Sequence, residues 1–299
     1  MPKAASNADG YLLLYKKSGL TSFDSLHQVK NALRTGKVGH TGTLDKFAEG
    51  LLVLLAGKYT SLVPIFNKLD KVYIGTIRFG IETDTLDPEG RVISTAPVPA
   101  KEVILQVLPH FIGSQIQIPP AYSAIHIDGQ RASERIRSGQ AVEMKGREIT
   151  IYSIEVLNVI ESRLTIKIHC SKGTYIRALA RDIGKAAGSC AYLESLKRVA
   201  VGPFNSKDAI SPDSGELGMD AIQGALKPVS PELFYQLKIP VLHLDASDTP
   251  YILQGRPLGP ILTKYGVRND SELMGVFAEN NRLLALIETG GTYRHVYPH

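Results

Sequence analysis

The strongest constraint on the fold is an unbroken apolar run, residues 51–56, that follows a loop rich in glycine and threonine. The loop reads Gly-His-Thr-Gly-Thr-Leu-Asp over residues 39–45, and its glycines allow turns that a side chain would block. The apolar run predicts a fully buried strand. Asp45 is thus carried on a loop anchored to a buried element, where catalytic groups tend to lie. The alternative is a polar turn in which Asp45 only caps the backbone.

The other hydrophobic patterns mix strands and helices without the regular alternation of a βαβ series. Strands are expected over residues 11–15, 71–80, 147–151, 154–160 and 164–170. Helices are expected over residues 22–33, 60–69, 99–111 and 175–187. Residues 191–201 fit either a strand or a helix. This mixture favours an α+β fold over a doubly wound parallel sheet.

The chain is long enough for one large domain and one small domain. It has 299 residues, of which 43% are hydrophobic and 21% charged, as in ordinary globular proteins. Between residues 203 and 240 the composition shifts toward Ser, Pro, Asp and Gly, so we place a boundary after residue 238. Residues 239–299 contain short apolar runs separated by glycine, which predict a small β-barrel.

The beginning of the chain and its overall hydropathy predict a cytoplasmic protein. Residues 1–10 are polar and lack the apolar core of a signal sequence, so we expect a short disordered tail. No run of about eighteen apolar residues exists, so no membrane span is expected. Cys170 and Cys190 have no metal-ligand spacing, and the sequence contains no motif for a metal or a cofactor.

Positive charge is concentrated in one segment. The net charge is +5, yet residues 163–207 carry nine basic residues against two acidic ones. The basic residues are Arg163, Lys167, Lys172, Arg177, Arg181, Lys185, Lys197, Arg198 and Lys207. Such a segment suits contact with a phosphate backbone, and an ordinary solvated face is the alternative. Residues 80–90 are acidic but lack the spacing of a calcium loop, so we interpret them as a hydrogen-bonded structural loop.

Five separated stretches of the chain resemble the TruB family of bacterial tRNA pseudouridine-55 synthases. They occur in the family's order and spacing over residues 10–201. The stretches are residues 13–22, residues 39–45, Tyr73 with residues 80–90, residues 119–124 with Gly129, and the string Lys-Gly-Thr-Tyr-Ile-Arg over residues 172–177. Each string is weak alone, and the set is specific.

The resemblance implies a catalytic domain over residues 11–238, built on a mixed, mainly antiparallel sheet with flanking helices. A PUA-like RNA-binding barrel would follow over residues 239–299, and residues 118–146 would form a clamp over the RNA. The implied activity is conversion of uridine 55 in the tRNA T-loop to pseudouridine by a monomer without cofactor or protein partner. The alternatives are a synthase subunit directed by a guide RNA, and a non-catalytic tRNA chaperone.

Carried over by motif, Asp45 would be the catalytic residue. Arg177 would lower its pKa and orient it. Tyr73 would stack on the target uracil, and Tyr175 would line the pocket. The sequence leaves open whether the carboxylate attacks the base, attacks ribose C1′ or assists loss of the 2′ hydrogen.

The resemblance also implies that further residues contact RNA. His40 would fill the space left by the extracted base, and the remaining candidates are Lys16, Arg131, Lys172 and Arg181. Some positions depart from the family pattern. Lys46 and Glu49 replace the usual Pro and Ser or Thr after the Asp, and His126 replaces a common Lys.

Overall fold

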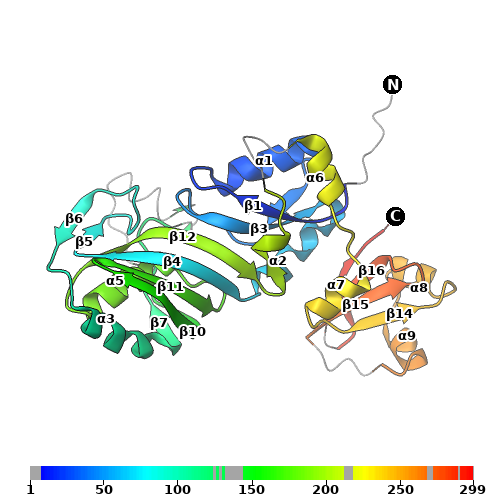
Figure 1. Ribbon diagram of the computed structural model, residues 1–299. Coiled ribbons are helices and arrows are strands. Elements are labelled where there is room, and N and C mark those ends of the chain that lie inside the picture. The colour runs from blue at the N-terminus through cyan, green and yellow to red at the C-terminus, as the bar shows by residue number, and fades with distance from the viewer. Residues whose placement is uncertain are drawn as a thin grey trace.

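The protein is built around one large, mainly antiparallel sheet. The computed structural model describes residues 8–123, 144–211, 218–267, 272–288 and 290–298, together with the backbone of 126–127 and 130–131. The sheet has nine strands in the order β1-β3-β12-β4-β11-β10-β7, with β2 paired to β3 and β13 to β12 (Figure 1). Within it, only β3 and β12 pair in parallel. The expected α+β class is confirmed.

The strands of this sheet agree in part with the hydrophobic patterns, which did not predict the short strands at residues 38–40, 113–117 and 204–205. They are β1 Gly10–Lys16, β2 Val38–His40, β3 Glu49–Ala56, β4 Lys71–Phe79, β7 Gly113–Gln117, β10 Arg147–Ile160, β11 Arg163–Cys170, β12 Ala191–Val201 and β13 Phe204–Asn205. The ambiguous residues 191–201 are therefore a strand. Smaller two-stranded sheets pair β5 Ile81–Thr83 with β6 Val92–Thr95, and β8 His126–Ile127 with β9 Gln130–Arg131.

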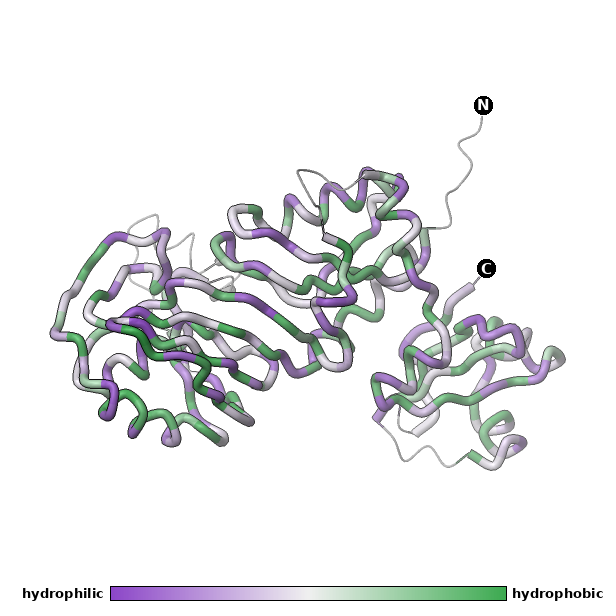
Figure 2. The backbone as a smooth tube through the Cα atoms, viewed as in Figure 1, coloured by the Kyte–Doolittle hydropathy of each residue, from purple (hydrophilic) through white to green (hydrophobic). Residues whose placement is uncertain are grey.

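The apolar run is continuous because β3 is buried on both faces. Leu52 and Leu54 pack toward α1 (Ser22–Ala32), whereas Leu51, Val53 and Leu55 pack into a second core on the opposite face. Figure 2 shows hydrophobic residues running along the central strands of the molecule. The loop that carries Asp45 is therefore attached to one of the most deeply buried strands of the sheet.

Two predicted helices are each divided at a proline. Residues 57–67 form the 3₁₀ helix η1 (Gly57–Leu62) and then α2 (Val63–Asn67), and residues 101–111 form α3 (Lys101–Val107) and then the 3₁₀ helix η2 (Leu108–Phe111). Pro64 and Pro109 stand in the first turn of the later helix in each pair, since proline cannot donate the backbone hydrogen bond of a helix interior. No helix of the described chain is long and apolar enough to cross a membrane.

The residues after β13 lead to a second sheet. The helical elements are η3 Ser206–Asp208, α6 Met219–Ala225, α7 Pro231–Gln236, α8 Thr249–Leu253 and α9 Gly259–Lys264. The strands β14 Val241–Leu244, β15 Leu273–Ala278, β16 Leu283–Glu288 and β17 Thr292–Val296 form one four-stranded sheet in that order. Phe234 of α7 packs edge-on against Phe277, and Tyr297 bonds Ser61 of η1 at 2.7 Å, so this sheet contacts the main body.

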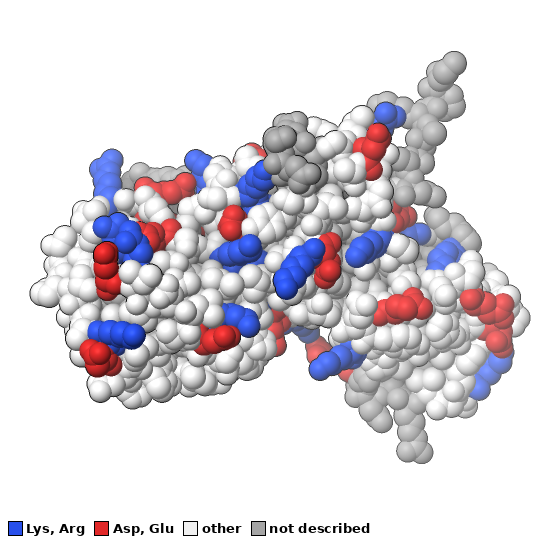
Figure 3. All heavy atoms as spheres, viewed as in Figure 1, with Lys and Arg blue, Asp and Glu red and all other residues white. Residues whose placement is uncertain are grey.

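The basic segment of residues 163–207 does not form one exposed stripe. Arg177 and Arg198 are buried, and several of the others are paired with carboxylates: Arg163 with Glu194, Lys167 with Glu155, and Arg181 with Asp182. On the face shown in Figure 3, basic and acidic side chains are interspersed. The linear cluster is dispersed because β11, α5 (Ile176–Ala186) and β12 point their side chains in different directions.

Candidate active site

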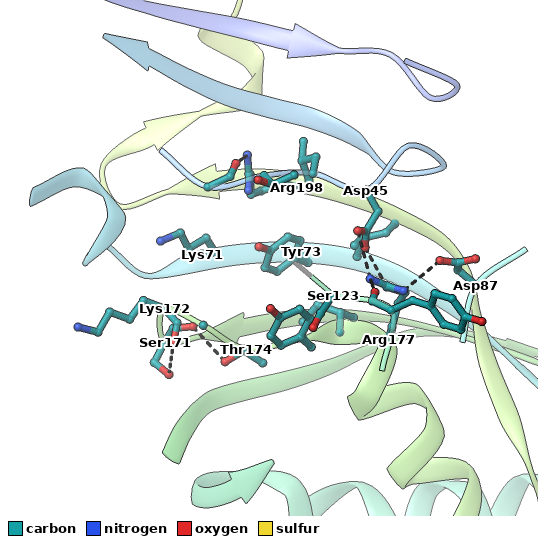
Figure 4. Close-up of a pocket in the computed structure, with 18 of the residues that line it drawn as sticks. Asp45, Lys71, Tyr73, Asp87, Ser123, Ser171, Lys172, Thr174, Arg177 and Arg198 are labelled. Atoms are coloured by element: carbon teal, nitrogen blue, oxygen red, sulfur yellow. Dashed lines mark hydrogen bonds and ion pairs between the residues drawn. The ribbon is translucent and has the colours of Figure 1, made fainter. Parts of the chain in front are cut away.

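A pocket of about 920 Å³ lies where the Asp45 loop meets the middle of the large sheet. Its lining comes from this loop, from β4 and β12, from the 80–90 loop and from the start of α5. Asp45, Tyr73 and Arg177 (Figure 4), together with Tyr175, all line it, although they were predicted from three separate motifs. The structure therefore brings these candidates into one cavity.

Asp45 and Arg177 form a close ion pair inside this pocket. Arg177 Nε lies 2.9 Å from Oδ2 of Asp45, and Nη2 donates a hydrogen bond to Oδ1 at 3.2 Å. The Nε–H is not aligned for a hydrogen bond, so that contact is electrostatic. The Arg177 side chain is only 6% exposed, whereas that of Asp45 is 38% exposed. The carboxylate is therefore the member of the pair that a ligand in the pocket can reach.

The acidic 80–90 loop and the carbonyl of Tyr122 hold the rest of the Arg177 guanidinium. Arg177 Nη1 donates to Oδ2 of Asp87 at 3.2 Å and to the carbonyl of Thr85 at 2.7 Å, and Nη2 donates to the carbonyl of Tyr122 at 3.1 Å. Asp87 is buried. Sequence reasoning took the 80–90 loop as structural and missed this role, although Asp87 lay within a matching stretch. The local sequence around Asp87 did not indicate that Asp87 would pair with Arg177, 90 residues further along the chain.

The pKa of Asp45 differs from the sequence expectation in its direction. We expected Arg177 to lower it, and the positive charge does act that way. Desolvation in the pocket is the larger effect, and the neighbouring Asp87 charge adds to it, so the pKa of Asp45 is raised. Asp45 and Asp87 share the single guanidinium of Arg177, so these three side chains together carry more negative than positive charge.

Contacts from two distant segments hold the Asp45 loop in place. Ser22 at the start of α1 accepts a hydrogen bond from the Leu44 N–H at 2.9 Å and donates to the Leu44 carbonyl at 3.1 Å. Arg198 of β12 donates to the carbonyls of Gly42 at 3.0 Å and Leu51 at 2.7 Å. Ser22 and Arg198 were not singled out as site residues, because a serine in a helix cap and an arginine in a strand carry no signal alone.

Gly50 is required for the close approach of β3 to β12. Its φ is +110°, and a Cβ at this position would lie 2.3 Å from the carbonyl oxygen of Arg198. Any larger residue would push apart the parallel pairing of Gly50 with Arg198. Gly50 thus allows β3, which follows the Asp45 loop, to lie against β12, whose Arg198 donates a hydrogen bond to that loop.

The two tyrosines occupy different walls of the pocket. Tyr73 on β4 is 9% exposed, and burial raises the pKa of its phenol, with Arg198 as a hydrogen-bond partner. The backbone of Tyr175, at the start of α5, is fixed at both ends by Gln117, which accepts from its N–H at 2.9 Å and donates to its carbonyl at 3.1 Å. The Arg147 guanidinium lies 5.4 Å from the Tyr175 ring centroid.

The five predicted RNA-contacting residues lie in different environments. Lys172 is exposed and lines the pocket. His40 on β2 lies outside the lining residues, and burial together with the charge of Arg198 lowers its pKa, which favours the neutral ring. The Arg131 side chain lies outside the part of the chain that the structure describes, as does most of the predicted clamp, residues 118–146.

Lys16 and Arg181, which are also predicted to contact RNA, both make contacts within the protein. Lys16 is 1% exposed, and its ammonium donates to the carbonyls of Leu20 at 2.6 Å and Lys46 at 3.4 Å. The second hydrogen bond holds the residue that directly follows Asp45. Arg181 donates to Asp182 at 2.8 Å and to the carbonyl of Ile118 at 2.9 Å. Both cations are occupied by the protein itself.

The unusual residues beside Asp45 have local roles. Lys46 forms an exposed ion pair with Glu89 at 3.8 Å, and both residues line the pocket. Burial, together with a hydrogen bond to Glu49, raises the pKa of Tyr15 to about 12. An exposed ion pair of this kind contributes little stability, so Lys46 and Glu89 can separate easily.

Comparison with solved structures shows the class of fold. The chain superposes on "Crystal Structure of a Cbf5-Nop10-Gar1 Complex" with a TM-score of 0.66, at 23% identity, covering 95% of this chain and 79% of that chain. It superposes on "Structure of H/ACA RNP bound to a substrate RNA containing 2'-deoxyuridine" with a TM-score of 0.65 at 22% identity, covering the same shares. At this level of identity the superpositions show that the chain shares the fold of these proteins.

Sequence comparison identifies the family. Residues 30–176 match the model of the TruB family pseudouridylate synthase (N terminal domain). The tRNA pseudouridine synthase B of Borreliella burgdorferi (strain ZS7) is 49% identical over 204 residues, which are 67% of this chain and 72% of that protein. The Aromatoleum aromaticum protein of the same name is 42% identical over 252 residues, covering 84% and 81%. The chain belongs to the TruB family of pseudouridylate synthases.

Proposed function

We propose that this protein isomerises uridine 55 in the T-loop of tRNA to pseudouridine, acting without a guide RNA. The observation that carries the proposal is the Asp45–Arg177 pair, in which the buried cation fixes a carboxylate that faces a nucleotide-sized pocket. The similar proteins at 42–49% identity are named tRNA pseudouridine synthase B. Their name supports tRNA as the substrate.

The reaction needs one carboxylate and neither a cofactor nor an energy source. The bond between ribose C1′ and uracil N1 breaks, the base turns, and a bond forms between C1′ and C5. The hydrogen on C5 leaves as a proton, and N1 gains one. In each of the three routes considered above, the ionised form of Asp45 is the reactive form. Arg177 holds that form at two points and is itself positioned by Asp87.

The target uridine is stacked in folded RNA, so it must be extracted before it can enter the pocket. We assign Tyr73 to the face of the extracted uracil and Tyr175 to the opposite part of the wall. His40, which is part of the 39–45 loop and whose lowered pKa favours the neutral ring, would fill the space that the base leaves. Lys172 would contact the backbone. The C-terminal sheet is proposed as a PUA-like RNA-binding unit, and the protein as a cytoplasmic monomer.

The guide-RNA alternative follows from the family resemblance, and the structural matches do not strengthen it, since their identity of 20–23% shows only a common fold. The relatives with about twice that identity carry the tRNA synthase name. A non-catalytic RNA chaperone would have no need of an ion pair aimed into the pocket. We therefore favour the stand-alone enzyme, and chaperoning remains compatible as a second activity.

One assay separates these functions. Purified protein is incubated with an unmodified tRNA transcript carrying tritium on uridine C5, and release of tritium is measured. We expect release without guide RNA, reduced at least about 10³-fold by Asp45→Asn while tRNA binding is retained. Release only after a guide RNA is added would support the alternative. Binding without any release would identify a chaperone.

A further inference from the structure

The pocket has two ends of opposite charge. Asp45 and Asp87 lie at one end, and the side chains of Lys71 and Lys172 extend toward the other (Figure 4). Tyr73 lies between the two ends on β4. The carboxylate end is accounted for by the proposed isomerisation. The steps proposed above for the glycosidic bond do not use the cationic end.

Lys71 is a buried ammonium without an acidic partner in ion-pair contact in the described structure. Its residue is 7% exposed, and Nζ donates to the carbonyls of Asn67 at 2.9 Å and Leu69 at 2.6 Å. An ammonium has three donors, so one remains for a ligand. Burying an ammonium without a counter-charge is unfavourable, which makes an anion the natural occupant of this end.

The surroundings of Lys71 are also predominantly positive. Burial is the largest effect that disfavours its charged form; Arg198 on β12 and Lys172 after β11 act in the same direction, and Asp70 and Cys170 act against them. The Cys170 thiol is itself kept neutral, since burial raises its pKa to about 12. Burial, with these cations, lowers the pKa of Lys71 to about 8. A bound anion would reverse this effect.

We propose that Lys71 and Lys172 bind one backbone phosphate of the substrate RNA next to the target uridine. This inference rests on the proposed function. Lys71 and Tyr73 lie two residues apart and both face the pocket, about 7 Å along the strand, which is roughly the extent of one nucleotide. A phosphate at Lys71 thus belongs to the nucleotide whose base lies at Tyr73. Such a contact positions the RNA irrespective of sequence.

The test uses a T-arm stem-loop RNA in which the linkage on either side of the target uridine is replaced by an uncharged methylphosphonate. Binding is measured for the wild type, Lys71→Met and Lys172→Ala. For one of the two linkages, we expect the neutral group to weaken wild-type binding about tenfold and to cost Lys71→Met almost nothing further. An equal loss in the wild type and in both variants would overturn the proposal.

Matched variants keep this result interpretable. Lys167→Ala removes an exposed cation on β11 that is paired with Glu155, and it should respond to the neutral linkage as the wild type does. Lys172 is exposed, so Lys172→Ala carries the test if Lys71→Met fails to fold. Lys71→Arg should retain binding. Between pH 7 and pH 9 wild-type binding should weaken as Lys71 loses its proton, and Lys71→Arg should not; parallel profiles would contradict the assignment.

Two further outcomes are distinguishable. If unmodified RNA binds with the expected linkage dependence but is never isomerised, the proposed function fails and the phosphate contact stands. If inorganic phosphate at matched ionic strength inhibits the wild type but not Lys71→Met, while neither neutral linkage matters, the site takes a free anion. That result would overturn the assignment to an RNA phosphate.

Discussion

Arg177 Nε lies 2.9 Å from Oδ2 of Asp45, although the two residues are 132 positions apart in the chain. Asp87 holds the other edge of the same guanidinium at 3.2 Å. Arg177 lowers the pKa of Asp45 and Asp87 raises it, so removal of the two groups should move the pH dependence of activity in opposite directions. These opposite shifts in the pH dependence of activity test the electrostatic roles of Arg177 and Asp87.

Replacing Arg177 by Gln removes the charge that favours ionised Asp45. The pKa of Asp45, already raised by burial, should rise further, so the acid side of the pH–activity profile should shift to higher pH. The rate at the optimum should fall about 10²- to 10³-fold, because the carboxylate also loses its orientation. Single-turnover tritium release from pH 5 to pH 9 measures both effects.

Arg177→Lys is the control for this prediction. It keeps the positive charge but cannot contact Asp45 and Asp87 together, because an ammonium lacks the planar fork of a guanidinium. We expect a smaller shift of the acid limb than in Arg177→Gln, with a reduced rate. If the acid limb of the pH–activity profile shifted equally in Arg177→Lys and Arg177→Gln, the charge at position 177 would not control the pKa of Asp45.

Asp87→Asn should move the acid limb to lower pH. The substitution removes a negative charge that raises the pKa of Asp45, so the carboxylate should stay ionised further into acid. The rate should nevertheless fall, by about tenfold or more, because Arg177 loses the buried partner that positions it. The same pH series measures this, and a shift toward higher pH would refute the stated electrostatic roles.

The salt dependence of tRNA binding should separate Lys172 from Arg181. Lys172 is exposed at the pocket, so Lys172→Ala should reduce the slope of log K against log salt concentration by about one. Arg181 is occupied by Asp182 and by the Ile118 carbonyl, so Arg181→Ala should leave the slope unchanged. Filter-binding measurements over a series of salt concentrations compare the slopes of the two variants. Equal slope changes would show that Arg181 also contacts the RNA.

Gly50→Ala should destabilise the fold strongly. A Cβ would be placed 2.3 Å from the Arg198 carbonyl at a φ of +110°, so we expect a loss of about 3 kcal/mol or more in the free energy of unfolding. Gly19 also has a positive φ, +88°, but has open space around its position, so Gly19→Ala should cost only about 1 kcal/mol. Chemical denaturation followed by circular dichroism compares the two.

The strands were readable from the sequence because their apolar residues repeat with clear periods. β3 could be recognised as fully buried from its unbroken run, and α1 was expected over residues 22–33; the structure adds a capping box between Thr21 and Asp24 at its start. The lengths of the helices near Pro64 and Pro109 were less predictable, since a 3₁₀ turn and an α-helix share much of the same pattern.

The sequence alone indicated the family, most of the longer strands of the main sheet, and Asp45, Tyr73, Tyr175 and Arg177 as candidates, because motifs of adjacent residues carry that information. Only the tertiary structure decided which charges meet. It joined Asp87 to Arg177, buried Lys16 against backbone carbonyls and left Lys71 without an acidic partner in ion-pair contact in the described chain. Burial and pairing arise between distant strands, so local patterns do not reveal them.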